Sequence, residues 1–373
     1  MRGQAWLSSI VGMVTVAAVT AWAQAGAPPA VARSLPTFTV DRAWPKPLPK
    51  WKLGDASSFA VDGQGNVWLL HRPRTLKPDE VALAAPPVVV FDGAGNLVKA
   101  WGGPGIGYEW PEREHGIHVD SKGFVWITGN YCPAPAAPGT APSALKPVSD
   151  DQILKFRGDG KFVLQIGKSN QSKGNADARN VHRAADVWLH PATNELFVAD
   201  GYGNHRVVVF NPETGAMTRM WGAFGKTPAD DDHCTLAPPA TSVGNEGPQS
   251  FSIVHAVRVA NDGLVYVADR ENRRVQVFTK DGTFVKQLIK ADTTFARDLA
   301  LSADPAQQFL YVGNGQDIVI VDRQALAIVG SIAVPGMIGG GHHLATDSKG
   351  NLYIAQTAAG LQKLTFTGMS AAR

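Results

Sequence analysis

The most regular feature of the chain is a repeated alternation of short apolar stretches and polar turns. Six segments share one order: an apolar strand, a polar turn, a second strand, a loop, a third strand and often a fourth. Turns such as DGQGN, DSKGF and DSKGN supply the Gly and Asx chemistry of tight hairpins. Stretches such as VVVF, LFVAD and VQVF are β-branched and aromatic, and no segment shows a sustained helical period. The pattern predicts an all-β fold, a six-bladed β-propeller.

The two ends of the repeat array are predicted to close this ring. The sixth repeat stops after its third strand, near Phe366, and the stretch TFTVDRAWP, which begins at Thr37, precedes the first repeat. Adding this N-terminal stretch to the sixth blade as its outer strand removes the sheet edges that an open array exposes. The alternative, an open solenoid, leaves those edges unpaired.

The first residues predict export from the cytoplasm. Arg2 precedes an apolar run from Ala5 to about Trp22, and Ala21-Trp22-Ala23 fits a small-residue cleavage site. We interpret residues 1–23 as a cleaved signal peptide of a secreted or periplasmic protein, without stable membrane insertion. A membrane helix is the alternative, because the run approaches the length that spans a bilayer. Residues 24–373 then form a single propeller domain, since propellers often exceed the average domain length.

Charge and cysteine content narrow the possible partners. The formal net charge of the full sequence is +3, and no block of basic residues stands out, so nucleic acid is not an expected partner. Cys132 and Cys234 are the only cysteines, and in an oxidising compartment they could pair. The sequence specifies no oligomeric state.

Three histidines occur at one repeat position in alternate repeats. The segments HGIHVDSKG, HAVRVANDG and HHLATDSKG carry His115, His255 and His342, and the intervening repeats have Ser57, Ala185 and Arg297 at the matching position. In a closed ring of six, equivalent positions of every second blade lie about 120° apart around the axis. A single histidine is usually a packing or surface residue, but three so placed predict a metal site.

Further polar residues are predicted at the same mouth of the central channel. The loop between the second and third strands of a blade returns to the face where the innermost strand starts. In three blades this loop contributes a basic or aromatic residue, namely Arg72, Tyr202 and Arg270. The other histidines lack the repeat relation, and Asp200 and Asp269 in these loops are expected to brace them. The long segments Pro133–Asp150 and Thr227–Ser250 also lie on this face and could wall a pocket.

These motifs resemble a known family. ADGYGNHRVVVF and ADRENRRVQVF are similar to NHL-type repeats, and with HGIHVD, VHAV and LLHR they resemble the catalytic domain of peptidyl-α-hydroxyglycine α-amidating lyase over nearly the whole of residues 24–373. The resemblance implies a six-bladed propeller with a catalytic zinc held by His115, His255 and His342. It also implies a catalytic tyrosine at Tyr202 and two active-site arginines at Arg72 and Arg270.

The sequence departs from this family at two places. The resemblance implies a structural calcium bound by the carbonyls of Phe59 and Ile117 and by an Asp directly after the third histidine, but that position is His343. Because calcium prefers carboxylate and carbonyl oxygens, a calcium site is not expected. A family cysteine that follows the tyrosine is Gly203 here, so the corresponding disulfide is absent.

The resemblance implies cleavage of the C–N bond of an N-acyl or peptidyl α-hydroxyglycine, giving a primary amide and glyoxylate. Zn²⁺, or another divalent first-row ion, would stabilise the developing alkoxide. Tyr202 would act as general base, and Arg72 or Arg270 would pair with the carboxylate of a small-molecule or peptide substrate.

Two other functions are compatible with a propeller. A lactonase-like metallohydrolase would keep the metal but change the reaction; such propellers usually hold calcium with carboxylate and Asn ligands, so an all-histidine site argues against it. A non-catalytic NHL-type binding module would have no need of histidines in alternate blades. Metal analysis would distinguish the non-catalytic binding module from the two enzymes. Glyoxylate release would distinguish the amidating lyase from the lactonase-like hydrolase.

Overall fold

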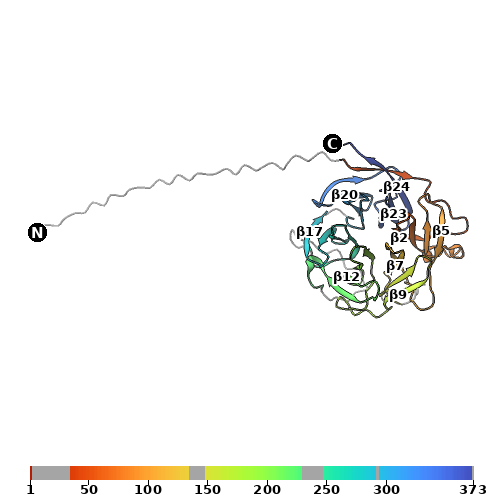
Figure 1. Ribbon diagram of the computed structural model, residues 1–373, viewed down its shortest axis with the longest axis horizontal. Coiled ribbons are helices and arrows are strands. Elements are labelled where there is room, and N and C mark those ends of the chain that lie inside the picture. Colours follow the sequence, from red (N-terminus) through yellow and green to blue (C-terminus); the bar gives the residue numbers. More distant parts are fainter. Residues whose placement is uncertain (2–33, 134–147, 229–246, 291–293, 372–373) are drawn as a thin grey trace.

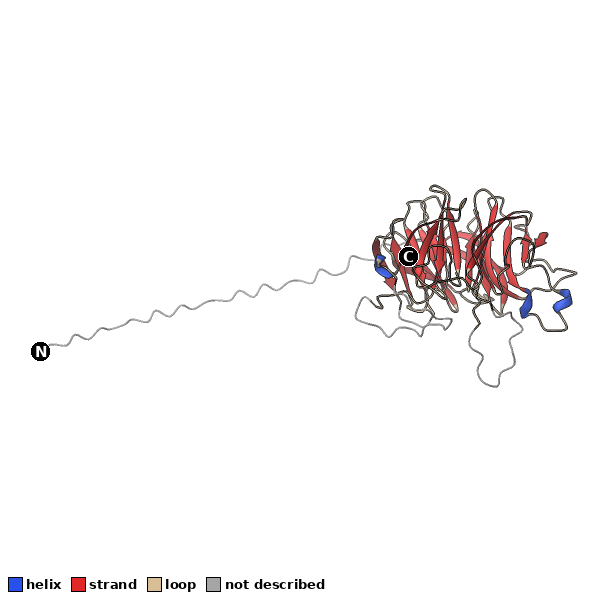
Figure 2. Cartoon of the chain, turned by 90° about the horizontal axis from the view of Figure 1, so that it is seen from below, coloured by secondary structure: helices blue, strands red, loops and turns tan. Residues whose placement is uncertain are grey.

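The computed structural model describes Met1 and residues 34–133, 148–228, 247–290 and 294–371. Its strands form six four-stranded antiparallel sheets arranged as blades around a central axis (Figure 1), as predicted. Viewed from the side, the strands run between two faces of the ring, and the loops lie on those faces (Figure 2). Within the described residues, helix is limited to three short 3₁₀ turns, η1 (Pro73–Thr75), η2 (Val81–Leu83) and η3 (Ala223–Gly225).

The first three blades follow one another along the chain, each with its innermost strand first. Blade 1 consists of β2 (Asp55–Val61), β3 (Val67–Arg72), β4 (Val88–Phe91) and β5 (Leu97–Trp101). Blade 2 consists of β6 (Glu114–Val119), β7 (Phe124–Gly129), β8 (Gln152–Arg157) and β9 (Phe162–Gly167). Blade 3 consists of β10 (Asp186–His190), β11 (Glu195–Asp200), β12 (Arg206–Phe210) and β13 (Met217–Trp221).

The second half of the ring repeats the same order until its last blade. Blade 4 consists of β14 (Val254–Val259), β15 (Val265–Asp269), β16 (Arg274–Phe278) and β17 (Phe284–Ile289). Blade 5 consists of β18 (Leu299–Leu301), β19 (Phe309–Asn314), β20 (Asp317–Asp322) and β21 (Ala327–Ile332). Blade 6 consists of β22 (His343–Thr346), β23 (Leu352–Gln356), β24 (Gly360–Met369) and, as its outer strand, β1 (Pro36–Asp41).

Blade 6 joins the two ends of the described ring, as predicted. Strand β1 pairs antiparallel with β24 from Pro36 opposite Met369 to Asp41 opposite Lys363. Strand β24 therefore continues three residues beyond the predicted end near Phe366, because β1 supplies hydrogen-bonding partners there. Just after β1, Trp44 is buried against Tyr353, with ring centroids 5.1 Å apart, and it also packs on Phe59 of blade 1. The N-terminal segment thus seals the junction between blades 6 and 1.

The hairpin turns owe their shape to aspartates at their first position. In blade 1, Asp62 accepts hydrogen bonds from the backbone N–H groups of Gln64 and Asn66, each at 2.9 Å, and from Nε1 of Trp68 at 2.9 Å. Such a carboxylate satisfies backbone donors that the turn leaves without partners. The hydrogen bond to Trp68 also links the turn to the apolar core of blade 1. The conformation of the turn and the position of the Trp68 ring in the core therefore depend on each other.

Several expectations fall outside or at the margin of the described residues. The expected signal peptide, residues 1–23, lies in the undescribed segment apart from Met1. Cys132 is disulfide-bonded, and Cys234, the other cysteine of the chain, is not among the described residues. The two long segments expected to wall a pocket are described only at their ends. In the part of the chain that is described, no helix has the length and apolarity needed to cross a membrane.

Candidate metal centre and active site

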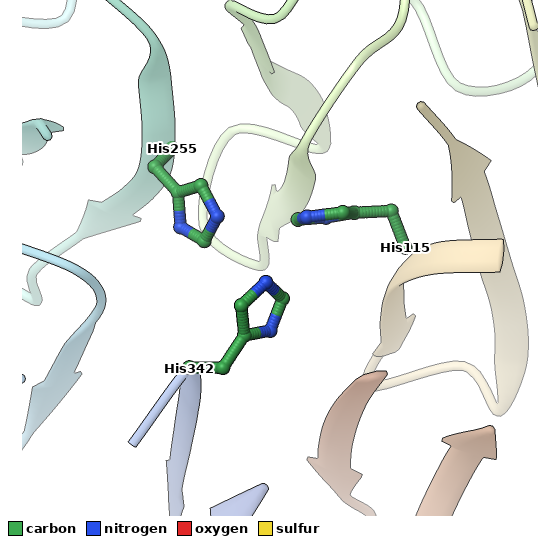
Figure 3. A group of neighbouring side chains, drawn as sticks. All are labelled: His115, His255 and His342. Atoms are coloured by element: carbon green, nitrogen blue, oxygen red, sulfur yellow. The ribbon is translucent and has the colours of Figure 1, made fainter. Parts of the chain in front are cut away.

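The three predicted histidines converge at the channel axis. His115 is the second residue of β6, His255 is the second residue of β14, and His342 directly precedes β22. Their ring centroids are 4.9 Å (His115–His342), 5.0 Å (His115–His255) and 5.0 Å (His255–His342) apart. One ligand nitrogen of each lies within 4.8 Å of the other two. Figure 3 shows the three rings gathered around one central point from three different blades.

Backbone carbonyls in the neighbouring blades orient two of these rings. Nδ1–H of His115 donates to the carbonyl of Ala185 at 2.7 Å, and Nδ1–H of His342 donates to the carbonyl of Ser57 at 2.9 Å. Because a carbonyl can only accept, Nδ1 carries the proton, and Nε2 of each ring keeps a free lone pair. For His255 the pattern is broken: its Nδ1 is buried without a hydrogen-bond partner among the described residues.

The surroundings keep all three imidazoles neutral. Burial lowers the pKa of each ring well below its ordinary value. The nearby imidazole of His342 lowers the pKa of His115 further, and the guanidinium of Arg270 does the same for His255. Neutral imidazole is the form that binds a metal, and a second hydrogen bond from the liganding ring is typical of metal sites. The residues present therefore fit a divalent ion held by three histidines.

Tyr202 lies directly against this cluster. Its hydroxyl oxygen is 3.0 Å from Nε2 of His115 and 3.1 Å from Nε2 of His255, and it accepts a 2.9 Å hydrogen bond from Nη1 of Arg270. The guanidinium of Arg183 lies over the tyrosine ring, 5.7 Å from its centroid. The phenolic oxygen thus contacts both the nitrogens of two histidines and the positively charged guanidinium of Arg270.

The two predicted arginines make different contacts. Arg270 follows β15, and besides Tyr202 it pairs with Glu271 through Nε and Nη2, each at 2.8 Å. Arg72 ends β3, and its Nε donates to the carbonyl of Glu114 at 2.8 Å. Within the described residues, the terminal nitrogens of Arg72 make no hydrogen bond, although the residue is buried. The structure therefore distinguishes the two arginines by their hydrogen-bond partners, a distinction that the sequence did not provide.

The loops that carry Tyr202 and Arg270 are braced as expected. Asp200 pairs with Arg206 at 2.9 Å, and Asp269 pairs with Arg274 at 2.6 Å, all four side chains being fully buried. After Tyr202, Gly203 packs so tightly on the ring of His182 that an added Cβ would lie 2.0 Å from it. A side chain at this position, including cysteine, would require His182 to move.

A second buried cluster lies in the channel next to the histidines. His343 on β22 is placed between two carboxylates, with Nε2 3.6 Å from Asp186 and Nδ1 3.4 Å from Asp298. Arg258 pairs with Asp186 and, at 3.5 Å, with Asp298. Burial alone would raise the pKa of Asp186, but the Arg258 guanidinium holds it below its usual range. Calcium prefers oxygen ligands, whereas a guanidinium and an imidazole lie among these two acids.

Sequence reasoning missed the residues that orient the centre. Ser57 and Ala185 were assigned no role, yet their carbonyls fix His342 and His115. A signal was present, because both stand at the histidine position in intervening blades, next to the histidine in the ring. Arg183, over Tyr202, carried no repeat signal at all.

Known proteins resemble this chain at low identity. The NHL repeat family matches residues 251–278. The chain is 26% identical over 286 residues to peptidyl-glycine alpha-amidating monooxygenase A of Xenopus laevis, covering 71% of this chain and 26% of that protein. It is 23% identical over 261 residues to peptidyl-alpha-hydroxyglycine alpha-amidating lyase 2 of Drosophila melanogaster, covering 66% of this chain and 52% of that protein. The chain thus spans about a quarter of the length of the Xenopus relative.

A solved streptogramin B lyase structure matches with a TM-score of 0.52 and 13% identity, covering 90% of this chain and 98% of that one, a likeness of fold alone. Fold and repeats together define a six-bladed propeller of NHL-type repeats. Within this class, the chain is similar at 23–26% identity to the amidating proteins of Xenopus laevis and Drosophila melanogaster named above.

Proposed function

We propose that the protein is an exported, metal-dependent lyase that cleaves the C–N bond of N-acyl or peptidyl α-hydroxyglycines to a primary amide and glyoxylate. The observation that carries this proposal is the position of Tyr202. Its hydroxyl lies within 3.1 Å of Nε2 of two histidines and accepts a hydrogen bond from Arg270. A proton acceptor at a three-histidine centre is what removal of a hydroxyl proton from the substrate requires.

The three histidines would hold Zn²⁺ or another divalent first-row ion. Bound there, the ion would act as a Lewis acid toward the substrate hydroxyl oxygen. Three protein ligands leave coordination positions open, as in catalytic rather than structural sites. The all-nitrogen ligand set favours zinc over calcium and argues against a calcium-dependent lactonase-like hydrolase.

Tyr202 takes the role of general base in this proposal. Acting in its phenolate form, Tyr202 accepts the proton of the α-hydroxyl group while the C–N bond breaks and the carbonyl group of glyoxylate forms. The electron pair of the broken bond goes to the amide nitrogen, which then receives the proton from Tyr202 and leaves as the primary amide. Arg270 stabilises the negative charge on the phenolic oxygen, because it donates to that oxygen directly.

Arg72 is the arginine available to the substrate. Arg270 is engaged by Tyr202 and Glu271, whereas the terminal nitrogens of Arg72 make no hydrogen bond within the described residues. Arg72 is therefore assigned to an oxygen of the substrate, either of its carboxylate or of its acyl group. Neither nucleic acid nor a membrane is required as a partner for this chemistry.

The test is glyoxylate release by metal-loaded protein from N-acetyl-α-hydroxyglycine. Because a general base contributes about 10²–10⁴-fold, Tyr202→Phe should lower kcat by about that factor, with metal content and melting temperature retained. Tyr353→Phe, which alters a buried tyrosine outside the centre, serves as the control. Fully metallated wild-type protein that releases no glyoxylate would overturn the reaction while leaving the metal centre intact.

A further inference from the structure

Two pockets of opposite character have lining residues at the starts of the innermost strands, the end of the blades that carries the histidines. The first, here called the blade 1–2 cleft, has a volume of about 910 Å³, and its lining includes Trp51, Pro73, Pro86, Tyr108, Trp110 and Glu114. The second, here called the arginine pocket, has a volume of about 310 Å³ and is lined by His255, Arg270, Glu271, Arg273, Thr294, Arg297, His342 and Thr357. Of the three histidines, His255 and His342 line the second pocket directly.

The blade 1–2 cleft adjoins the centre through the chain itself. Glu114, at one wall, immediately precedes His115 on β6, and its carbonyl accepts the hydrogen bond from Nε of Arg72. Pro73, another wall residue, immediately follows Arg72. The lining of the cleft is thus one residue away, along the chain, from both His115 and Arg72.

The lining of the cleft selects against a carboxylate. Three aromatic residues and five prolines line the cleft, and three glutamates, Glu109, Glu112 and Glu114, outnumber the single arginine there. That arginine, Arg74, is already paired with Glu112. An apolar group gains from burial against such walls, whereas an anion would be repelled.

The arginine pocket has the opposite charge. Its three arginines exceed its single acid, Glu271, which is paired with Arg270. Arg297 is half-buried, and its side chain makes no hydrogen bond or ion pair within the described residues. It occupies in blade 5 the repeat position that carries His255 in blade 4 and His342 in blade 6, so its guanidinium is placed beside the centre.

We propose that the substrate lies across the centre with its carboxylate on Arg297 and with a bulky apolar acyl group in the blade 1–2 cleft. This inference rests on the proposed function, because it assigns the two arms of an N-acyl-α-hydroxyglycine to the two pockets. Arg72, between the centre and the cleft, then donates to the acyl oxygen rather than to the carboxylate. Trp51, Trp110 and Arg297 determine specificity in this arrangement.

The test compares N-phenylacetyl-α-hydroxyglycine with N-acetyl-α-hydroxyglycine. Wild-type protein should prefer the phenylacetyl compound by about tenfold or more in kcat/KM, because the added ring buries apolar surface in the cleft. Trp51→Ala should reduce this preference several-fold, and Ala84→Trp, which fills the cleft, should do the same. Ile106→Ala, a change in the exposed loop before β6 that does not line the cleft, should keep the preference.

Arg297→Gln should lower kcat/KM for both compounds by about tenfold or more while keeping their ratio.

Binding of N-phenylacetylglycine and N-acetylglycine, which lack the reacting hydroxyl, is measured by calorimetry in parallel. If the phenylacetyl compound binds more tightly but no glyoxylate forms from either substrate, the pocket assignment stands and the proposed reaction falls. Equal kcat/KM values for the two substrates, or a preference that survives both cleft variants, would overturn the inference while the lyase activity stands. An Arg297→Gln protein with unchanged kcat/KM would overturn the carboxylate assignment.

Discussion

The nitrogen that His115 and His342 present to the channel axis depends on a carbonyl group in the next blade of the ring. Ser57 serves His342, and Ala185 serves His115, across the junctions between blades 6 and 1 and between blades 2 and 3. His255 has no such acceptor among the described residues. Because a hydrogen bond at the second nitrogen fixes the orientation of a liganding ring, His255 is the least constrained of the three.

This geometry predicts one metal ion per chain and its loss when a ligand is removed. Wild-type protein dialysed against Zn²⁺ and then desalted should retain about one equivalent, and His255→Ala should weaken binding by at least about 100-fold, more than the loss of an outer partner costs. Metal content by mass spectrometry checks this. His190→Ala, a histidine on a distant hairpin, is the matched control. Retention of a full equivalent by His255→Ala would contradict the centre described above.

A different buried histidine makes stability depend on pH. His71 accepts a hydrogen bond from the Gly54 N–H at Nδ1 and donates to the Pro86 carbonyl from Nε2, so only the neutral ring fits. Burial lowers its pKa from 6.5 to about 4. Between these values the unfolded chain binds the proton and the folded chain does not. The free energy of unfolding therefore falls as pH drops from about 6.5 to 4, by on the order of 3 kcal/mol for this residue.

Urea unfolding of metal-free protein at several pH values measures this effect. His71→Gln keeps a donor for Pro86 but cannot be protonated, so its free energy of unfolding should fall less steeply than that of wild type across the same window. The other buried histidines are present in both proteins, and the difference between the two curves isolates His71. Parallel curves would show that His71 does not carry the dependence.

At this scale the sequence predicted which residues meet, but not how they bond. Equivalent repeat positions map to equivalent places on a ring, so His115, His255 and His342 could be placed together without coordinates. The division of work between Arg72 and Arg270 could not be predicted. The different contacts of the two arginines depend on the directions of their side chains and on their partners, Glu114 for Arg72 and Glu271 for Arg270. Nothing in the repeat pattern marks either glutamate as a partner.

Strands and hairpins were predictable because their signals are local. Each Asx turn, such as that of Asp62, satisfies its own backbone donors within five residues, and the β-branched stretches on either side fix the strands. Closure by β1 was predictable for a different reason, since the sixth repeat lacked a strand and the N-terminal stretch had the pattern of one. The connections β3–β4 and β5–β6, which form the blade 1–2 cleft, gave no such signal. In the second of these connections Tyr108 packs on Trp110, with ring centroids 6.4 Å apart, a contact that follows no repeat position.

Across the whole molecule, the ring brings charges from distant repeats into one channel. His343, Asp186 and Asp298 come from blades 6, 3 and 5, and Arg258 comes from blade 4. Buried acids of this kind need compensating positive charge, because the desolvation of an unpaired carboxylate is costly. Here the compensation comes from side chains of the protein itself, where the family resemblance implies a calcium ion.

This arrangement of charged side chains predicts how the protein responds to Ca²⁺. Added Ca²⁺ should raise the melting temperature of wild-type protein little, because an imidazole and a guanidinium occupy the space between Asp186 and Asp298. His343→Asp should be destabilised without Ca²⁺, since three carboxylates would then face one arginine. Ca²⁺ should restore the melting temperature of this variant in a saturable way, because an ion that binds only the folded state stabilises it by mass action. Differential scanning calorimetry at constant ionic strength, with Mg²⁺ as the control ion, measures both responses. A large, saturable Ca²⁺ stabilisation of the wild-type protein would show that the channel binds calcium despite His343.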